Sequence, residues 1–329
     1  MPGFFGFDAV GDFSYWRHVE TILSEFLPEA ELHAVRTRPT ASLTWRAERL
    51  ERSIRETAGP HDPIHLVGHS TGAIDGRLLV HRSELGPRVR SIVSVCGPHH
   101  GTPSAAFFSS VFGRQMLSAV SLCTVYVLRY GRLPVAAALK LSALMSRVGD
   151  RVLGSDAGEL LDELHETLLG DFGEKQQGAV SALMREVSED TSLLPQLTPD
   201  AMELFNATTP DREGVRMASI TCRASPPGLG KTLKAGLRPR SQAMNAIYAC
   251  CYALASQTDD RDNDAIVPTA SQRWGKVLRE VEADHLDVLG HYGDPSLDPP
   301  RYDWLPTDSG FNRHHFRAVW GDIAAFIAG

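Results

Sequence analysis

The chain has 329 residues, of which 43% are hydrophobic, and its 33 basic and 40 acidic side chains give a net charge of −7 at pH 7. This composition is typical of a globular protein, and domain sizes of roughly 100 to 200 residues allow two modest domains or one large domain with an insertion. Because no dense basic cluster offsets the acidic balance, the chain lacks the field that attracts phosphate backbones. We therefore expect no nucleic-acid partner.

Short β-type runs alternate with helical patterns over the first hundred residues. The patterns predict helices near 15–26 and 43–55, and strands near 32–36, 64–67 and 89–95. Strands that alternate with helices favour a parallel sheet covered by helices on both faces. The fold class predicted for this chain is therefore α/β, with a mostly parallel sheet flanked by helices.

A glycine-rich turn follows the strand predicted at 64–67. The segment 68–72 reads Gly-His-Ser-Thr-Gly, which matches G-x-S-x-G between a strand and a helical pattern, the setting of a nucleophile elbow. The glycines let the backbone turn tightly enough to expose a serine hydroxyl at the strand's end. Ser70 is the predicted nucleophile, whereas His69 is interpreted as merely preceding it. The alternative interpretation is a plain Gly-Ser turn.

The pattern becomes purely helical between residues 103 and 207. Leucines 160, 161, 164 and 168 share one helical face, and Thr198-Pro199 has the form of a helix start, a cap followed by a first-turn proline. β character returns at 215–222, so we predict one domain over 1–329 that contains a helical insertion at 103–207. The apolar stripes of the insertion fit a lid over the site and ordinary core packing equally well.

A serine elbow needs a base and an orienting carboxylate, which on this fold follow in the order serine, acid, histidine. Asp264 lies in a turn-rich loop ahead of an Ile-Val-Pro run, and His285 follows a strand predicted at 277–281. We predict that His285 takes the proton of Ser70, while Asp264 holds the imidazole in the useful tautomer. The crowded acidic loop also offers the alternatives Asp259, Asp260 and Asp262.

The oxyanion of an acyl-transfer reaction needs preorganised N–H donors, one from the residue after the nucleophile and one from an early loop. Thr71 is the predicted first donor. The early loop at 2–7 reads Pro-Gly-Phe-Phe-Gly-Phe, and the backbone N–H of Phe4 is the predicted second donor. The phenylalanines of this loop would line an acyl pocket or belong to the core.

Taken in chain order, the early loop, the elbow and several later segments resemble motifs of the bacterial true lipases, which are α/β-hydrolases that act on triacylglycerols. Residues 2–4 and Tyr15-Trp16 resemble that family's oxyanion loop and Y-W segment, with proline in place of histidine. The other similar segments are the elbow, 97–103, 197–206, the Asn263-Asp264 loop and 285–287. The series spans nearly the whole chain. It implies an α/β-hydrolase fold, lipase activity and a mobile helical lid after 97–103.

The chain departs from this family at two places. The family binds a structural calcium through two aspartates, and Asp287 matches one of them, but 241–256, where the other is expected, contains no Asp or Glu. The second aspartate is thus missing from the expected position. Because calcium needs several oxygen ligands, this argues against a calcium site. The family's buried strand ahead of the oxyanion loop also has no counterpart before Met1. We therefore hypothesise a natural start upstream, with a signal peptide.

Cysteine usage and hydropathy leave the compartment open. Five cysteines are an odd number and too few for a disulfide scaffold. The most apolar windows, 116–128 and 133–145, fall short of the roughly 18 residues of a membrane span, so we expect no transmembrane segment. As written, without a signal peptide, the chain is expected in the cytoplasm, and a natural start upstream of Met1 would make it secreted.

Two further motifs are incomplete. The segment 228–232 ends like a phosphate-binding loop, but Ser225 replaces its first glycine and Pro226-Pro227 removes two N–H groups, which argues against nucleotide binding. Residues 260–264 resemble the start of an EF-hand, but Ala265 takes the position of the turn glycine. Both are better interpreted as loops.

The predicted function is a serine ester hydrolase of lipase type, cleaving carboxylic esters of lipids through an acyl-enzyme on Ser70 without a catalytic cofactor. An acyltransferase and a short-chain carboxylesterase with the same triad remain alternatives. A third alternative is a non-catalytic binding protein of the same fold. The expected partners are a lipid or small-molecule ester and, transiently, a lipid interface.

Overall fold

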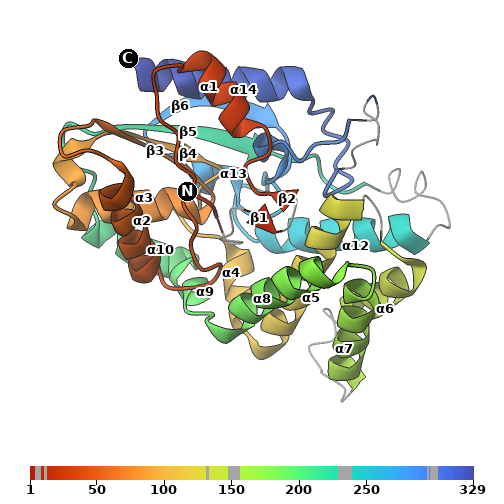
Figure 1. The fold of residues 1–329 in the computed structure, drawn as a ribbon. Helices are drawn as coiled ribbons and strands as arrows, with labels where there is room; N and C mark the ends of the chain where they lie inside the picture. Colours follow the sequence, from red (N-terminus) through yellow and green to blue (C-terminus); the bar gives the residue numbers. More distant parts are fainter. Residues whose placement is uncertain are drawn as a thin grey trace.

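A parallel sheet forms the centre of the molecule in the computed structural model (Figure 1). The structure describes residues 1–3, 9–10, 13–130, 133–146, 156–228, 239–294, 296 and 303–329. The strands of the sheet lie in chain order, β3 (Ile64–His69), β4 (Val89–Val95), β5 (Arg216–Arg223) and β6 (Lys276–Glu282), and all neighbours run parallel. A separate antiparallel pair joins β1 (Ala9–Val10) to β2 (Phe13–Ser14).

Helices cover both faces of this sheet, as the alternating pattern predicted. Helices α1 (Val19–Phe26) and α14 (Arg313–Ala328) pack on one face, and α2 (Leu43–Thr57) and α3 (Thr71–Arg82) pack on the other (Figure 1). The fully buried Trp320 anchors α14 beside the apolar side chains of β4 and β5. Because both faces are covered, β4 carries a nearly continuous run of buried residues rather than an alternating one.

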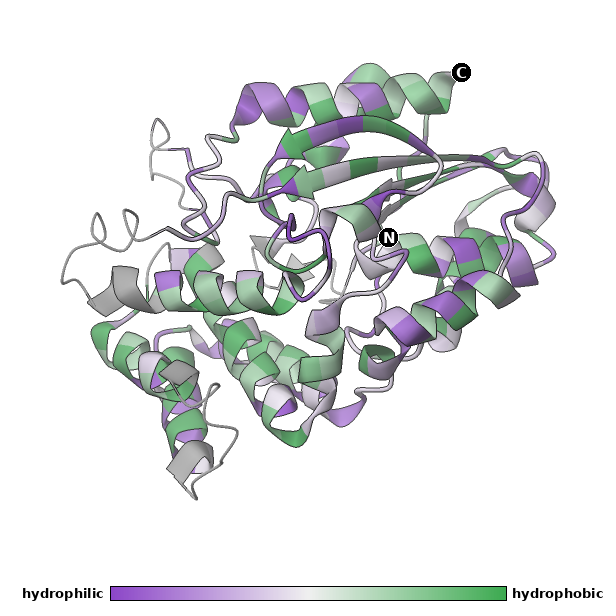
Figure 2. Ribbon diagram, turned by 180° about the vertical axis from the view of Figure 1, so that it is seen from behind, coloured by the Kyte–Doolittle hydropathy of each residue, from purple (hydrophilic) through white to green (hydrophobic). Residues whose placement is uncertain are grey.

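The connection between β4 and β5 is helical. It contains α4 (Pro103–Ser109), α5 (Val111–Tyr130), α6 (Val135–Ser146), α7 (Asp156–Leu169), α8 (Glu174–Glu189), α9 (Leu193–Gln196) and α10 (Pro199–Thr208). Thr198 caps α10 as expected, with its hydroxyl accepting from the Ala201 N–H. Figure 2 shows that hydrophobic residues are frequent in this layer. Their inner faces form one cluster with α12 (Pro239–Ala255). No described helix is long and apolar enough to cross a bilayer.

Two predicted elements differ from the structure. The strand predicted near 32–36 is wrong, because this segment has no regular secondary structure and pairs with none of the described strands. The helix predicted near 15–26 begins only at Val19, because His18 adopts a left-handed conformation with φ of 62°. Tyr15 and Trp16 therefore precede the helix. The remaining short helices are η1 (Gly86–Arg88), α13 (Thr269–Gln272) and η2 (Asp287–Leu289).

Candidate active site

Ser70 occupies a strained turn between β3 and α3. Its backbone has φ of 54° and ψ of −129°, a region that L-residues rarely adopt and that costs about 1–3 kcal/mol. Gly68 permits the turn, since a Cβ there would lie 2.4 Å from the backbone nitrogen of Ala73. The Ser70 N–H donates to the carbonyl of Val95 at 2.8 Å, which ties the elbow to the end of β4.

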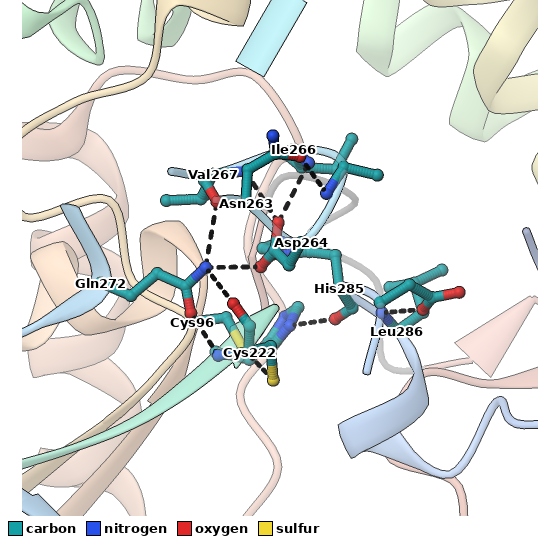
Figure 3. Close-up of polar contacts among 12 residues, drawn as sticks. Cys96, Cys222, Asn263, Asp264, Ile266, Val267, Gln272, His285 and Leu286 are labelled. Atoms are coloured by element: carbon teal, nitrogen blue, oxygen red, sulfur yellow. Dashed lines mark hydrogen bonds and ion pairs between the residues drawn. The ribbon is translucent and has the colours of Figure 1, made fainter. Parts of the chain in front are cut away.

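Asp264 and His285 form a buried pair at the same edge of the sheet. His285 Nδ1 lies 2.7 Å from Asp264 Oδ2, and their exposed fractions are only 6% and 0%. The other carboxylate oxygen, Asp264 Oδ1, accepts the N–H groups of Ile266 and Val267 at 3.0 and 2.8 Å (Figure 3). The His285 N–H also donates to the Asp264 carbonyl at 3.1 Å. These bonds hold the carboxylate and the imidazole in one orientation.

Gln272 joins the acid loop to β5. Its Nε2 group lies 3.1 Å from Asp264 Oδ2 and donates to it, while its Oε1 accepts the Cys222 N–H at 2.7 Å (Figure 3). Gln272 is fully buried, so these bonds are sheltered from water. Sequence reasoning missed this residue, since nothing in a Ser-Gln pair after a proline turn indicates a contact with a carboxylate eight positions earlier.

The carboxyl ends of parallel strands bring the three predicted residues to one edge. Ser70 follows β3 and His285 follows β6, while Asn263, beside Asp264, accepts through its carbonyl from the Ala224 N–H at the end of β5. Among the described residues no hydrogen bond joins the Ser70 hydroxyl to His285. Catalytic hydrogen bonds are often long before substrate binds and shorten in the complex.

Only one of the two predicted oxyanion donors, Thr71, belongs to the described residues. Thr71 begins α3, and among the described contacts its N–H binds no acceptor, so it is free for a substrate oxygen. Phe4 lies outside the described residues. Its neighbour Gly3 packs directly on the nucleophile, because a Cβ at Gly3 would lie 2.6 Å from the Cβ and 3.1 Å from the Oγ of Ser70. Any side chain at position 3 would therefore clash with Ser70.

A buried arginine holds the segment that carries Gly3. Arg46 Nη2 donates to the carbonyls of Pro2 and Gly3 at 2.8 and 3.2 Å. The same guanidinium pairs with Asp75 on α3 at 2.8 Å, and both side chains are no more than 1% exposed. Burial raises the pKa of Asp75, and the charge of Arg46 opposes that rise. Sequence patterns did not single out either residue.

Asp284 and Asp287 lie on either side of His285 and are buried. Asp284 Oδ2 and Asp287 Oδ1 have no hydrogen-bond partner among the described residues. Burial and then the charge of Asp303 raise the pKa of Asp284 to about 8, while burial and then Asp284 raise that of Asp287 well above its usual range. Unpartnered carboxylate oxygens of this kind fit a hard divalent cation. The resemblance in sequence points to Asp287 alone.

Comparisons with known proteins identify the fold. No protein-family profile and no curated protein matches the chain. The lipase of Staphylococcus hyicus is similar in structure, with a TM-score of 0.56, 18% identity, and coverage of 99% of this chain and 93% of its own. Lipase 1 from Pelosinus fermentans has a TM-score of 0.54 and 16% identity, over 98% of this chain and 97% of its own.

A metagenomic carboxyl esterase, MGS0156, is matched more loosely, with a TM-score of 0.48 and 19% identity over 89% of this chain. The chain spans 64% of the length of that esterase. The two closer likenesses, over nearly the whole of both chains, confirm the predicted α/β-hydrolase fold of the bacterial lipases.

Proposed function

We propose that this protein is a serine ester hydrolase of lipase type. The observation that carries the proposal is the strained backbone of Ser70 at the edge of the sheet where Asp264 and His285 are paired at 2.7 Å. Strain of about 1–3 kcal/mol at a single residue persists only where the surrounding structure enforces it, and such strain is common at active sites. The fold shared with two bacterial lipases supports the same conclusion.

The mechanism follows from the positions of these groups. His285 Nε2 accepts the Ser70 proton as the serine oxygen attacks the ester carbonyl carbon. Asp264 keeps the proton of His285 on Nδ1 and stabilises the imidazolium. The N–H of Thr71 donates to the oxyanion, and the second donor expected from the sequence is Phe4, which lies outside the described residues. His285 then gives the proton to the leaving alcohol, an acyl-enzyme remains, and water activated by His285 releases the acid. No cofactor takes part in these steps.

Lipid contact is assigned to the helices between β4 and β5. Val111 on α5 and Leu139 and Val135 on α6 are 63%, 56% and 42% exposed. Apolar side chains that solvent reaches on one helical layer suit transient contact with a lipid interface. The helices of this layer would then act as a lid and admit long acyl chains.

Hydrolysis of p-nitrophenyl esters of increasing acyl length tests the proposal. We expect activity that rises towards long chains in the wild type and falls by several orders of magnitude in Ser70→Ala, because the nucleophile is lost. Ser24→Ala, an exposed serine on α1, is the matched control and should leave the rates unchanged. A short-chain optimum would indicate a carboxylesterase, and faster turnover with an added alcohol would indicate an acyltransferase. Full activity in Ser70→Ala would refute the proposal.

We further propose that Asp284 and Asp287 hold a structural calcium ion, with Asp284 replacing the aspartate absent from 241–256. The support is the pair of buried carboxylate oxygens without hydrogen-bond partners among the described residues. Bound calcium would neutralise these charges and stiffen the loop that carries His285. It would supply no catalytic chemistry.

Thermal unfolding tests the calcium site. Excess calcium should raise the melting temperature by several degrees relative to protein in a chelator, because an ion that binds only the folded state stabilises it by mass action. Asp284→Asn should abolish the calcium response, whereas Asp190→Asn, at the exposed end of α8, should retain it. Equal melting curves with calcium and with chelator would rule the site out.

A further inference from the structure

A series of buried hydrogen bonds, called the relay below, connects Gly3 to the backbone of His285, the proposed base. Gly3 and its neighbours in the loop at 2–7 are called the oxyanion segment. The Gly3 N–H donates to the phenol oxygen of Tyr15 at 2.8 Å. That oxygen lies 2.6 Å from Nδ1 of His69, and His69 Nε2 lies 2.8 Å from the carbonyl oxygen of His285. Tyr15 and His69 are 3% and 0% exposed, so water does not compete for these bonds. The triad itself includes neither side chain.

The direction of each hydrogen bond is fixed by the groups at its ends. A carbonyl oxygen only accepts, so His69 Nε2 carries the proton that is donated to His285. Burial, and then the nearby His285, hold the pKa of His69 well below its usual range, so the ring is neutral and Nδ1 is an acceptor. Burial also raises the pKa of Tyr15, whose phenol therefore keeps the proton that it donates to Nδ1. Each of these hydrogen bonds is thus donated in the direction that leads from Gly3 to His285.

Both ends of this chain lie against reacting groups. Gly3 is packed on Ser70 and is followed by Phe4, the residue proposed as an oxyanion donor. At the other end, the backbone of His285 is held on both sides, through its N–H by the Asp264 carbonyl and through its own carbonyl by His69. The ring of His69 also contacts that of His285 in a tilted arrangement, with centroids 4.6 Å apart and an angle of 52° between the planes.

Contacts from other elements fix the relay in place. Trp16 and His69 form a T-shaped ring pair at a centroid distance of 6.5 Å. His291 Nε2 donates to the Tyr15 carbonyl at 3.0 Å, which ties the Tyr15 backbone to the loop after His285. The relay is therefore built into the core rather than attached to a surface loop.

We propose that Tyr15 and His69 are positioning residues that set the oxyanion segment and the base in register with Ser70. His69 directly precedes Ser70 in the sequence. Its side chain therefore connects the nucleophile to the backbone of His285, and Tyr15 connects His69 to Gly3. The inference rests on the proposed function. A misplacement of about 1 Å at such groups costs on the order of 100-fold in turnover.

Kinetics of four variants test the relay. Tyr15→Phe should lower kcat by about 10- to 100-fold with KM nearly unchanged, because substrate binding is not involved. His69→Gln keeps an amide N–H that reaches the His285 carbonyl, whereas His69→Asn keeps only an acceptor for Tyr15. We expect His69→Gln to retain the higher kcat. The control is Thr57→Val, which loses a hydroxyl hydrogen bond to the Ser53 carbonyl at the exposed end of α2 and should behave as wild type.

The double variant Tyr15→Phe with His69→Gln separates a relay from two independent contacts. In a relay, its kcat equals that of the worse single variant, since groups that act as a unit are non-additive. Losses that multiply would overturn the proposal, as would a folded Tyr15→Phe enzyme with wild-type kcat. Inactivity of the wild type on every ester would instead contradict the proposed function.

Nitrogen NMR of the imidazoles gives a readout that does not depend on activity. In ¹⁵N-histidine-labelled protein near pH 7, the His69 resonances, assigned by their loss in His69→Gln, should show a neutral ring protonated on Nε2. Tyr15→Phe should shift the Nδ1 resonance, because its hydrogen-bond donor is removed. A ring protonated on Nδ1, or charged on both nitrogens, contradicts the relay whether or not the protein hydrolyses esters.

Discussion

Asp264→Asn should lower kcat by about ten-thousand-fold while the protein remains folded. The asparagine amide would face His285 Nδ1, which would then become an acceptor, and the imidazole proton would move to Nε2. A protonated Nε2 cannot take the proton of Ser70. The two backbone N–H groups bound at Asp264 Oδ1 still find a carbonyl-type oxygen in asparagine. The loss should therefore appear in ester hydrolysis, while circular dichroism stays unchanged and the melting temperature falls only by the effect of the lost Gln272 Nε2 bond to Oδ2.

Asp262→Asn is the matched control in the same loop. Its carboxylate is exposed and pairs with Arg223 at 3.2 Å, an interaction worth about 1 kcal/mol or less. We expect kcat to change by less than about twofold. The reverse result, with activity lost in Asp262→Asn and kept in Asp264→Asn, would move the role of the acid to Asp262.

Arg46→Met should destabilise the fold by about 3–5 kcal/mol, because it leaves the Asp75 carboxylate buried without its partner. Burial already raises the pKa of Asp75, and without Arg46 nothing of comparable size opposes the rise. The folded carboxyl then binds a proton more tightly than the unfolded one. Unfolding free energy should consequently increase as the pH falls towards the unfolded pKa, and urea titrations between pH 5 and pH 8, roughly, measure this slope.

The double variant Arg46→Met with Asp75→Leu separates stability from function. Replacing both charges by apolar groups should recover most of the unfolding free energy. Turnover should remain low, because the carbonyls of Pro2 and Gly3 still lack the donor that Arg46 supplies. Recovery of full activity together with stability would mean that Arg46 does not position the oxyanion segment.

Local sequence was sufficient to predict three residues that the fold brings to one edge of the sheet, including the Asp264–His285 pair, but not the groups that hold them. Ser70 lies in a motif of five residues, and Asp264 and His285 follow in the chain order that this motif demands. Arg46, Gln272 and Tyr15, by contrast, act through partners that are 44, 8 and 54 positions away. No periodicity marks such pairs, because their role depends on how the sheet and its helices meet.

His69 and Asp284 show the same limit at closer range. Both adjoin a predicted site residue, yet the elbow motif gives His69 no role beyond preceding Ser70, and no pattern in the sequence marks Asp284 as a ligand. Their partners come from distant segments or share a buried loop. The false strand at 32–36 has a related cause, since a β pattern forms a strand only where another strand offers free backbone groups.

The place at which the helical layer leaves the sheet has an evolutionary consequence. The layer departs after Val95 and returns at Arg216, and β4 and β5, which it connects, are direct neighbours paired from Ser91 to Val95. Because these strands are parallel, the segment leaves at the carboxyl end of β4 and returns at the amino end of β5. Only its two ends are tied to the sheet, so the helices between them can be lengthened, shortened or exchanged without shifting the strand register. Ser70, Asp264 and His285 all lie outside it. Natural variation and laboratory recombination can therefore diversify this segment, and with it the lipid contact proposed for its helices, while the three residues proposed as the triad stay unchanged.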